Sequence, residues 1–383
     1  MTRKIAIQQP ALPAYRVPFF KHLHELAGGH TVDVFYGSEE PALTNVDPVG
    51  FRGFFAPFRQ WRLPLLGSVR WHGIQVKLVL SRDYDLVVLS SNPRVLSLWL
   101  ALVMARVFSV NTAVWGHAST KCSRKAMRER INLAVMKLAG AVVLYDDLTY
   151  QHFLDAGFPA AKLYVAPNGL DSDALAEARE QALQTCGNKG GARTLLDVDA
   201  SHVLLYVGRL EQTNRLDLAI QALPAVLDTF PNTRFIIIGK GDDEQRSLEK
   251  LATRLGVLSK VAFKGPIYNP VAVARWMLAA DLFVYPSNIG LSLIHAFNNR
   301  LPVVVCPPVS AHNPEIATLV HRKNGIITDE MSAQSLAQSI AMLLTDSHTR
   351  NAMGTAGLAI VEQRYNNTEM VKAFLDLFRA TAA

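Results

Sequence analysis

Residues 202–210 read HVLLYVGRL, in which five apolar residues, 203–207, are followed by a glycine and an arginine. An uninterrupted apolar run of this length is typical of a strand buried on both faces of a parallel sheet. The glycine after it allows a tight turn at the end of the strand. The stretch therefore predicts a central strand of an α/β sheet, with Arg209 at its carboxyl end.

Similar runs recur on both sides of this stretch. After it come TRFIIIGKG, KVAFKGPI, DLFVYPSN, LPVVVCPP and NGIITD, and before it come KIAIQQ, TVDVFYG, DLVVLSS, NTAVWGH, GAVVLYD and KLYVAPNG. Helical stretches such as 17–27 and 94–108 separate the runs. Short apolar strands that alternate with helices form parallel βαβ units. We therefore predict an α/β protein with two Rossmann-like domains, each built on a doubly wound parallel sheet.

The composition is consistent with two domains. The chain has 383 residues, of which 50% are apolar and 19% are charged, so it is long enough to bury two cores. We predict an N-terminal domain over residues 1–170, a linker over 171–200, a second domain over 201–362 and an amphipathic helix over 363–383. The linker contains the polar, glycine-rich segment CGNKGGAR, which predicts an exposed loop.

The cysteines, the N-terminal sequence and the longest apolar run indicate in which cellular compartment the protein is expected. The three cysteines, Cys122, Cys186 and Cys306, are scattered, so they predict neither a disulfide framework nor a zinc site and fit a reducing compartment. The N-terminal sequence MTRKIAIQQP has no apolar signal-peptide core, so we expect a cytoplasmic chain that begins here. The longest apolar run, VLSLWLALVMA at 95–105, is shorter than the roughly 20 residues of a membrane span and predicts a buried helix packed on a sheet.

The strand ends carry residues that suit a phosphate ligand. Ligands of doubly wound sheets bind beyond the carboxyl ends of the strands, so with two domains we expect the site in the cleft between them. Arg209 places a guanidinium at such an end. The alternative for Arg209 is an ion pair with a carboxylate at the start of the next helix.

Glycines and a short loop add to this prediction. Gly208, Gly239 and Gly265 follow strands, where glycine allows a ligand to approach closely but more often serves the backbone alone. The segment SNIGL offers backbone N–H groups at a helix start, which suits an anion; its residues are Ser287, Asn288, Ile289, Gly290 and Leu291. Together with Arg209, these features predict a site for a nucleoside diphosphate.

The same blocks resemble a known family. LLYVGRLEQTNRLDLAIQAL, FIIIGKGDDEQRSLEKLATRLGVLSKVAFKGPI, ADLFVYPSNIGLSLIHAF, LPVVV, NPEI and NGIITD, in this order within residues 201–346, are similar to the donor-binding half of the retaining GT-B glycosyltransferases of family four. LPAYRVPFFKHL, WGHAS and VAPNGLDSDAL resemble the acceptor-side half. The resemblance implies two Rossmann-like domains that face a cleft, with the terminal helix crossing back to the first domain.

The chain departs from this family at its donor site. Two glutamates that the family usually carries are replaced by Ser287 and His295, and a lysine after GRL is replaced by Asn214, with Arg215 adjacent. The resemblance places His295 where a side chain holds the ribose hydroxyls, and imidazole can form that hydrogen bond. The alternative is a histidine that only packs in the first turn of a helix.

Two further positions follow from the resemblance. It places His117 of WGHAS against the donor sugar or its phosphate and thus, with Arg209, among the catalytic residues; the alternative is a satisfied histidine at a strand end. It also places contacts to the base around Lys264 and Gly265, up to Tyr268. The segments DSD at 171–173 and DVD at 197–199 imitate a metal motif but lie in the predicted linker. We expect neither a metal nor another cofactor.

The predicted function is transfer of a sugar, with retention, from a UDP or GDP sugar to a glycan or lipid-linked acceptor in cell-surface polysaccharide synthesis. Two alternatives stay open. One is a degenerate GT-B protein that acts as a non-catalytic partner, which the missing glutamates and lysine favour. The other is a nucleotide-sugar epimerase, although such enzymes usually need acidic catalytic residues in the cleft.

The charge points to further partners. The formal net charge is +7, and residues 1–170 carry 19 Lys and Arg against 11 Asp and Glu. No nucleic-acid-binding module accompanies this excess, so we expect no nucleic acid. Basic residues next to aromatic or apolar ones make an anionic membrane surface a candidate partner, with the protein peripheral on the inner face of the plasma membrane; they are Arg59, Arg62, Arg70, Lys121, Arg124, Lys125, Arg128 and Arg130. The alternative is a solvated helix face and ordinary core residues.

Overall fold

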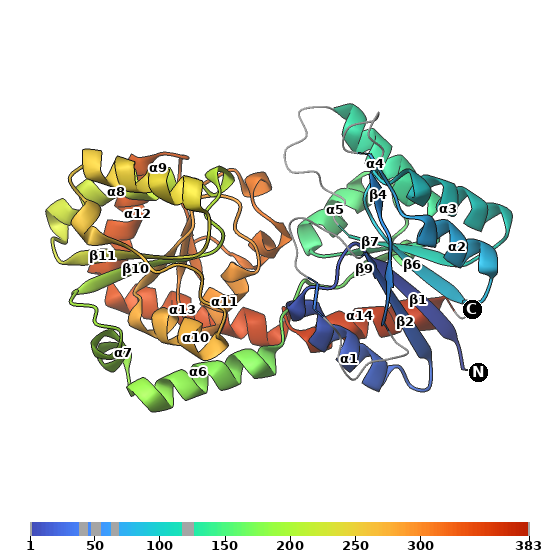
Figure 1. Ribbon diagram of the computed structural model, residues 1–383, viewed down its shortest axis with the longest axis horizontal. Coiled ribbons are helices and arrows are strands. Elements are labelled where there is room, and N and C mark those ends of the chain that lie inside the picture. The colour runs from blue at the N-terminus through green and yellow to red at the C-terminus, as the bar shows by residue number, and fades with distance from the viewer. Residues whose placement is uncertain (1, 38–44, 47–54, 63–68, 117–125, 382–383) are drawn as a thin grey trace. The chain divides into compact units, whose positions relative to one another are not determined.

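The computed structural model describes residues 2–37, 45–46, 55–62, 69–116 and 126–381. The chain divides into two compact units (Figure 1): unit 1 is Met1–Asp171 with Asn367–Ala383, and unit 2 is Ser172–Asn366. Each unit contains a parallel sheet between helices, so the prediction of an α/β protein with two doubly wound parallel sheets is confirmed.

Unit 1 contains a seven-stranded sheet in the order β3-β2-β1-β6-β7-β8-β9, and every neighbouring pair is parallel. The strands are β1 (Lys4–Gln9), β2 (Thr31–Gly37), β3 (Phe55–Phe58), β6 (Leu86–Ser90), β7 (Thr112–Trp115), β8 (Ala141–Leu144) and β9 (Leu163–Val165). A short antiparallel pair, β4 (Trp61–Arg62) and β5 (Arg70–Trp71), stands apart from this sheet.

Helices cover both faces of this sheet. One face packs on α1 (Val17–Leu26) and α14 (Asn367–Ala380), and the other on α2 (Gly73–Ser81), α3 (Leu96–Val107), α4 (Ala126–Leu138) and α5 (Asp147–Asp155). The strand pleat explains the division, since Ile5 and Ile7 belong to the core with α1 and α14 whereas Ala6 belongs to the other core. Phe374 of α14 completes the first core, with its ring 5.3 Å from that of Phe19.

Helix α3 contains the longest apolar run of the sequence. The prediction of a buried helix holds for its inner face, where Leu98, Ala101 and Leu102 are inaccessible to solvent. Its outer face is also apolar but exposed, because an all-apolar sequence supplies more apolar surface than one sheet face can cover. Of the helices in the described residues, none has the length and apolar character that crossing a bilayer requires.

Unit 2 contains a six-stranded parallel sheet in the order β12-β11-β10-β13-β14-β15. The strands are β10 (His202–Val207), β11 (Thr233–Ile238), β12 (Val261–Phe263), β13 (Leu282–Val284), β14 (Val303–Val305) and β15 (Gly325–Ile327). The chain first builds outward from β10 to β12 and then returns to build from β13 to β15. The strand order therefore reverses between β10 and β13, the position at which doubly wound sheets bind their ligands.

The helices of unit 2 form two layers, one on each side of the sheet (Figure 1). One layer contains α8 (Leu216–Thr229), α9 (Asp242–Arg254) and α12 (Ala333–Thr345). The other contains α6 (Ser172–Cys186), α7 (Lys189–Leu195), α10 (Pro270–Ala279), α11 (Ser292–Asn298) and α13 (Ser347–Gln363).

Residues 171–200, which the sequence predicts as a linker with an exposed loop, consist mainly of α6 and α7 and belong almost entirely to unit 2. The polar composition of this segment predicted a loop, but two of its cations pair with a buried carboxylate. The carboxylate of Asp281 lies 2.8 Å from Lys189 Nζ and 2.5 Å from an Nη atom of Arg193, and it accepts a hydrogen bond of 2.8 Å from the Val203 N–H. Two cations thus fix α7 to the start of β13.

Candidate functional site

The candidate site lies at the point in unit 2 where the strand order reverses. The loop after β10 contains Gly208, Arg209 and Asn214, and the loop after β13 is residues 285–291. The two loops are bonded to each other: Asn288 Nδ2 donates to Asn214 Oδ1 over 2.7 Å, and the backbone N–H of Ser287 donates to the carbonyl of Asn214 over 3.2 Å. Residues that are 74 positions apart thus form one surface.

Asn214 is the link between these loops and is only 2% exposed. Its Nδ2 donates to the hydroxyl of Tyr206 over 2.8 Å and to the carbonyl of Arg209 over 2.6 Å, and the same carbonyl accepts from the Tyr206 hydroxyl over 2.7 Å. Since both side-chain atoms are engaged within the protein, Asn214 acts in this structure by positioning the backbone of Arg209. Direct contact between Asn214 and a donor stays a prediction.

The glycines at the strand ends serve close backbone packing. The Gly208 N–H donates to the Ile238 carbonyl over 3.0 Å, and the Gly239 N–H donates to the Gly265 carbonyl over 2.9 Å. A Cβ on Gly239 would lie 1.8 Å from the Gly208 oxygen, so no side chain fits there. Gly265 has a φ of +68°, which favours glycine. These contacts align the ends of β10, β11 and β12, and a ligand role for the three glycines stays a prediction.

The predicted cations differ in solvent exposure and in how firmly an acidic side chain holds them. The side chain of Arg209 is 64% exposed and lies 2.7 Å from Glu211 Oε1, so it has both solvent access and an acidic partner. Lys264 is exposed, with its Nζ 5.4 Å from the ring centroid of Trp276. Arg215 instead donates from Nε and Nη2 to the two carboxylate oxygens of Asp217, over 3.0 Å each. Arg209 and Lys264 are therefore the predicted cations best able to meet a diphosphate.

Residues 285–291 are held by a segment that sequence reasoning did not assign to the site. Asn313 Nδ2 donates to the Asn288 carbonyl over 2.9 Å, and His312 Nδ1 accepts from the Ile289 N–H over 3.3 Å. His312 Nε2 lies 2.7 Å from the Cys306 carbonyl, so this ring nitrogen carries the proton. In the sequence, His312 and Asn313 begin the block HNPEI, which does not reveal the partners of either side chain. Within the part of the chain that the structure describes, the N–H groups of Gly290 and Leu291 donate to no other group.

His295 is the middle residue of the short helix α11 and is half-buried. Desolvation lowers its pKa to about 4, so the ring is neutral at pH 7. Its ring nitrogens have no hydrogen-bond partner among the residues described, which leaves them able to meet a ligand hydroxyl. Ser287, the other position of the missing glutamates, is 4% exposed. His117, the second predicted catalytic residue, lies outside the described residues.

Two tyrosines were also missed by sequence reasoning. Tyr206 and Tyr285 lie at neighbouring strand ends with ring centroids 4.4 Å apart. A Cβ on Gly208 would be 2.9 Å from the Tyr285 hydroxyl, which explains the glycine between them. Burial raises the pKa of both phenols, so they are neutral hydrogen-bonding groups at pH 7. They looked like ordinary apolar strand residues in the sequence.

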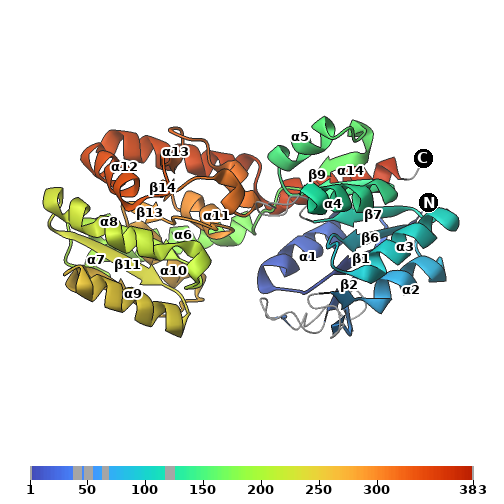
Figure 2. The same ribbon diagram turned by 90° about the horizontal axis from the view of Figure 1, so that it is seen from above.

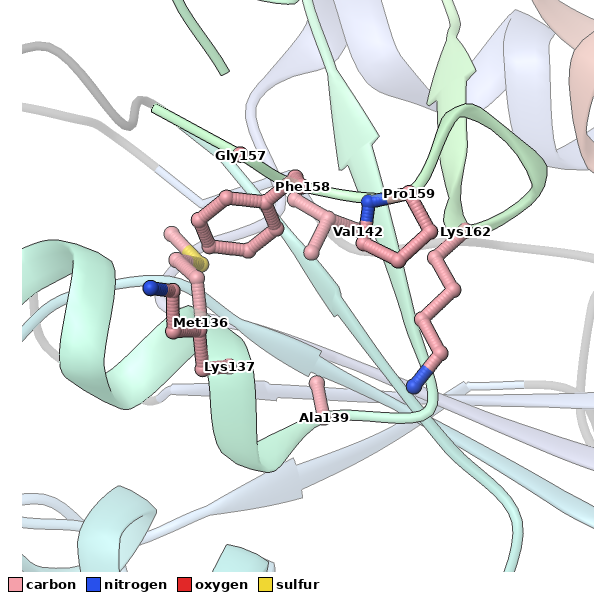
Figure 3. A pocket seen from close by; sticks show the side chains of 8 residues that line it. All are labelled: Met136, Lys137, Ala139, Val142, Gly157, Phe158, Pro159 and Lys162. Atoms are coloured by element: carbon pink, nitrogen blue, oxygen red, sulfur yellow. The ribbon is translucent and has the colours of Figure 1, made fainter. Parts of the chain in front are cut away.

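A cavity of about 140 Å³ lies elsewhere, in unit 1 (Figure 3). It lies between the end of α4 and the segment before β9, and it is lined by Met136, Lys137, Ala139, Val142, Gly157, Phe158, Pro159 and Lys162. None of the predicted site residues lines it. Among the described residues, no three His, Cys, Asp or Glu side chains come together in a way that could hold a metal ion.

Residues 195–359 match the family Glycosyl transferases group 1. The chain is 31% identical over 180 residues to D-inositol 3-phosphate glycosyltransferase of Segniliparus rotundus, a match of 45% of this chain and 39% of that protein. It is 27% identical over 257 residues to the GDP-mannose-dependent alpha-(1-6)-phosphatidylinositol monomannoside mannosyltransferase of Mycobacterium tuberculosis, a match of 63% of this chain and 62% of that protein.

Solved structures share the fold of both units. Anabaena Alr3699/HepE in complex with UDP matches with a TM-score of 0.71 at 18% identity, over 99% of this chain and 100% of the other. Sucrose-phosphate synthase of Thermosynechococcus elongatus matches with a TM-score of 0.67 at 20% identity, over 98% of both chains. At these identities the likeness concerns the fold. The sequence matches to the two relatives span 39% and 62% of their lengths.

Proposed function

We propose that the protein is a retaining glycosyltransferase, on the premise that residues 195–359 match the glycosyl transferases group 1 family. Its donor is a nucleoside diphosphate sugar, and its acceptor is a glycan or a lipid-linked molecule of cell-surface polysaccharide synthesis. UDP is bound by one protein of the same fold and GDP-mannose is named for one relative, so both bases belong to the proposal. The reaction needs no metal.

The observation that carries the proposal is the position of Arg209. Its guanidinium is exposed at the carboxyl end of β10, beside the reversal of strand order. The N–H groups of Gly290 and Leu291, which have no acceptor among the described residues, lie in the loop after β13, the neighbouring strand. A guanidinium and backbone N–H groups match the charge and acceptors of a diphosphate.

The ion pair with Glu211 does not prevent this use of Arg209. Pairs between exposed side chains contribute only about 0–1 kcal/mol. A diphosphate carries more charge and more acceptor oxygens than one carboxylate, so exchange of Glu211 for the donor is favourable.

In the proposed reaction, the bond between the anomeric carbon and the diphosphate breaks while the acceptor oxygen bonds to that carbon from the same face. The acceptor's proton passes to the departing diphosphate. Arg209 and the N–H groups of residues 290–291 stabilise the charge that develops on this leaving group. His295 holds a ribose hydroxyl through its neutral ring, and His117 acts at the transferring sugar.

One observation favours a second candidate. Residues 285–295 contain no acidic side chain, with Ser287 and His295 at the positions where the family usually carries glutamates. A degenerate GT-B protein that binds nucleotide as a non-catalytic partner has the same features. An epimerase is the third alternative.

The deciding experiment first screens UDP, GDP and ADP by thermal shift, because a ligand that binds the native state raises the melting temperature. The matching sugar donors are then incubated with the protein and candidate glycan or lipid acceptors. Glycosylated product with the anomeric configuration of the donor is expected. Nucleotide binding without product from any donor indicates the non-catalytic partner, and an epimerised nucleotide sugar indicates the epimerase.

A further inference from the structure

Helix α3 of unit 1 carries an apolar surface that the proposed function does not use. Leu96, Leu100, Val103 and Val107, here called the α3 stripe, are 41%, 41%, 46% and 67% exposed. Their spacing of four, three and four residues places them on one side of the helix, opposite the buried Leu98, Ala101 and Leu102. Helix α2 lies beside α3 on the same face of the sheet (Figure 2).

The charged groups beside the α3 stripe are cationic. Arg94 precedes α3, Arg106 lies in its last turn, and Lys77 is exposed on α2. Neither helix contains an Asp or Glu. Arg106 donates to the carbonyls of Leu138 and Lys137 over 3.1 and 2.8 Å. Both acceptors are backbone carbonyls, so these bonds hold the guanidinium in place without neutralising its charge.

The end of α3 continues this pattern. Phe108 follows the helix and is 36% exposed, and the guanidinium of Arg82 lies 4.8 Å from its ring centroid. The nearest acids in the sequence are Asp83 and Asp85, and Asp85 accepts a hydrogen bond of 2.7 Å from the Lys4 N–H.

The antiparallel pair β4–β5 meets the start of α3. It is joined there because the Arg70 N–H donates to the Arg94 carbonyl over 2.9 Å. Trp61 of β4 is 52% exposed, and the guanidinium of Arg59 lies 4.4 Å from its ring centroid. Tryptophan beside arginine is typical of side chains at the boundary between lipid headgroups and water.

We propose that the α3 stripe docks on the surface of an anionic lipid bilayer, with the helix lying in the plane of the interface. A helix of 12 residues is only about 18 Å long, whereas a bilayer core is about 30 Å thick, so α3 lies on the membrane rather than across it. Leu and Val side chains enter the boundary of the acyl chains while Arg94, Arg106 and Lys77 meet lipid phosphates.

The charges also argue against a second copy as the occupant. In a two-fold dimer the same patch faces itself, so the positive charges of one copy would face those of the other and repel them. An anionic bilayer instead complements both the apolar stripe and the cations. Arg130 of the membrane segment predicted from sequence is exposed, whereas Lys121, Arg124 and Lys125 lie outside the described residues. The proposal does not depend on the glycosyltransferase assignment.

The test is flotation of the full chain with phosphatidylcholine vesicles that contain or lack phosphatidylglycerol. We expect binding to the anionic vesicles, weaker binding to phosphatidylcholine alone, and loss of binding as salt increases. Two double variants, Leu100→Glu with Val103→Glu and Leu100→Ser with Val103→Ser, should each lower the partition coefficient at least about tenfold. Leu258→Glu in unit 2, at a residue that is 42% exposed, is the matched control and should bind like the unmodified chain.

Melting temperature and circular dichroism verify that each variant is folded. No binding to anionic vesicles at low salt overturns the proposal. Retained binding by the serine variant overturns it too, because the apolar stripe then contributes nothing. Sedimentation that shows a concentration-dependent dimer, abolished by either double variant, assigns the stripe to self-association instead.

Discussion

Asn288 donates a hydrogen bond of 2.7 Å to the side-chain oxygen of Asn214, and this bond joins the two loops on either side of the strand-order reversal. Because Asn214 also donates to the Arg209 carbonyl, the backbone that carries the exposed guanidinium is linked to the loop after β13. The candidate site is therefore one connected unit rather than two independent strand ends.

Asn214→Ala tests that connection. The substitution removes one partner of the Tyr206 hydroxyl and one partner of Asn288 Nδ2, and a buried polar group that loses a partner costs about 1–3 kcal/mol. We expect the free energy of unfolding in urea to fall by that amount, and the affinity for the donor nucleotide to fall as well. Asn232→Ala is the control, since Asn232 is exposed and bonds only the Ser201 hydroxyl through its amide nitrogen; it should change stability by less than about 0.5 kcal/mol. Equal effects at both positions would contradict the positioning role.

Arg209→Ala should weaken binding of the donor nucleotide by about 2 kcal/mol, the scale of a lost charged hydrogen bond, as measured by titration calorimetry. Arg209→Lys should restore affinity only in part, because lysine lacks the planar fork of the guanidinium. Arg246→Ala is the matched control. Its side chain is also 64% exposed and also has an acidic partner, Asp243, but it lies on α9. Unchanged affinity in a folded Arg209→Ala protein would show that this arginine is structural.

Glu211→Gln tests the exchange of partners at Arg209. The carboxylate competes with a diphosphate for the guanidinium at 2.7 Å, and the amide removes its charge while keeping its shape. We expect nucleotide affinity to rise by up to about 1 kcal/mol, the usual limit for an exposed pair. Weaker nucleotide binding in this variant would mean that Glu211 orients Arg209 for the ligand.

The sequence allowed the sheets to be predicted because parallel strands with helices on both faces are apolar throughout. The run HVLLYV of β10 is an example, with Val203, Leu204, Leu205 and Tyr206 all buried. It also predicted that residues after β10 and after β13 belong to one site, since carboxyl ends of parallel strands share an edge. The roles of the individual side chains stay predictions.

Other features depend on partners far along the chain and could not be predicted. Lys189 and Arg193 were assigned to a linker because nothing in their neighbourhood indicates that Asp281, about 90 residues later, is buried beneath them. His312 and Asn313 hold residues 285–291 through bonds that depend on how β14 ends. The exposed face of α3 was missed for a different reason, since an apolar run does not reveal which of its faces lacks a cover.

Asp281 makes the stability of unit 2 sensitive to acid. Desolvation raises the pKa of its carboxyl, but Lys189 and Arg193 outweigh this effect and hold the pKa below the ordinary value near 3.8. A depressed pKa stabilises the fold above the unfolded-state value, and that contribution is lost as pH falls through the folded-state value. Asp281→Asn should therefore lower the free energy of unfolding by about 3 kcal/mol at pH 7, with the gap to the unmodified chain shrinking below about pH 4. Urea unfolding from pH 7 to pH 3 measures this gap, and a gap that stays constant would contradict the ionic role.

His295→Ala tests the ribose contact. A hydrogen bond to a ribose hydroxyl is equally present in the ground and transition states, so its loss raises the donor KM more than it lowers kcat. We expect KM to rise several-fold, which corresponds to about 1 kcal/mol for one neutral hydrogen bond. His117→Ala should show the opposite pattern, a loss mainly in kcat, and His295→Glu should keep much of the binding because a carboxylate accepts from both ribose hydroxyls. Because desolvation lowers the pKa of His295 to about 4, the ring is neutral throughout pH 5 to 8, and the effect of His295→Ala on KM should be constant over that range. An effect that changes around pH 6.5 would mean that the ring is solvated and titrates normally. If donor KM stays unchanged in His295→Ala while the melting temperature falls, the histidine only packs in α11.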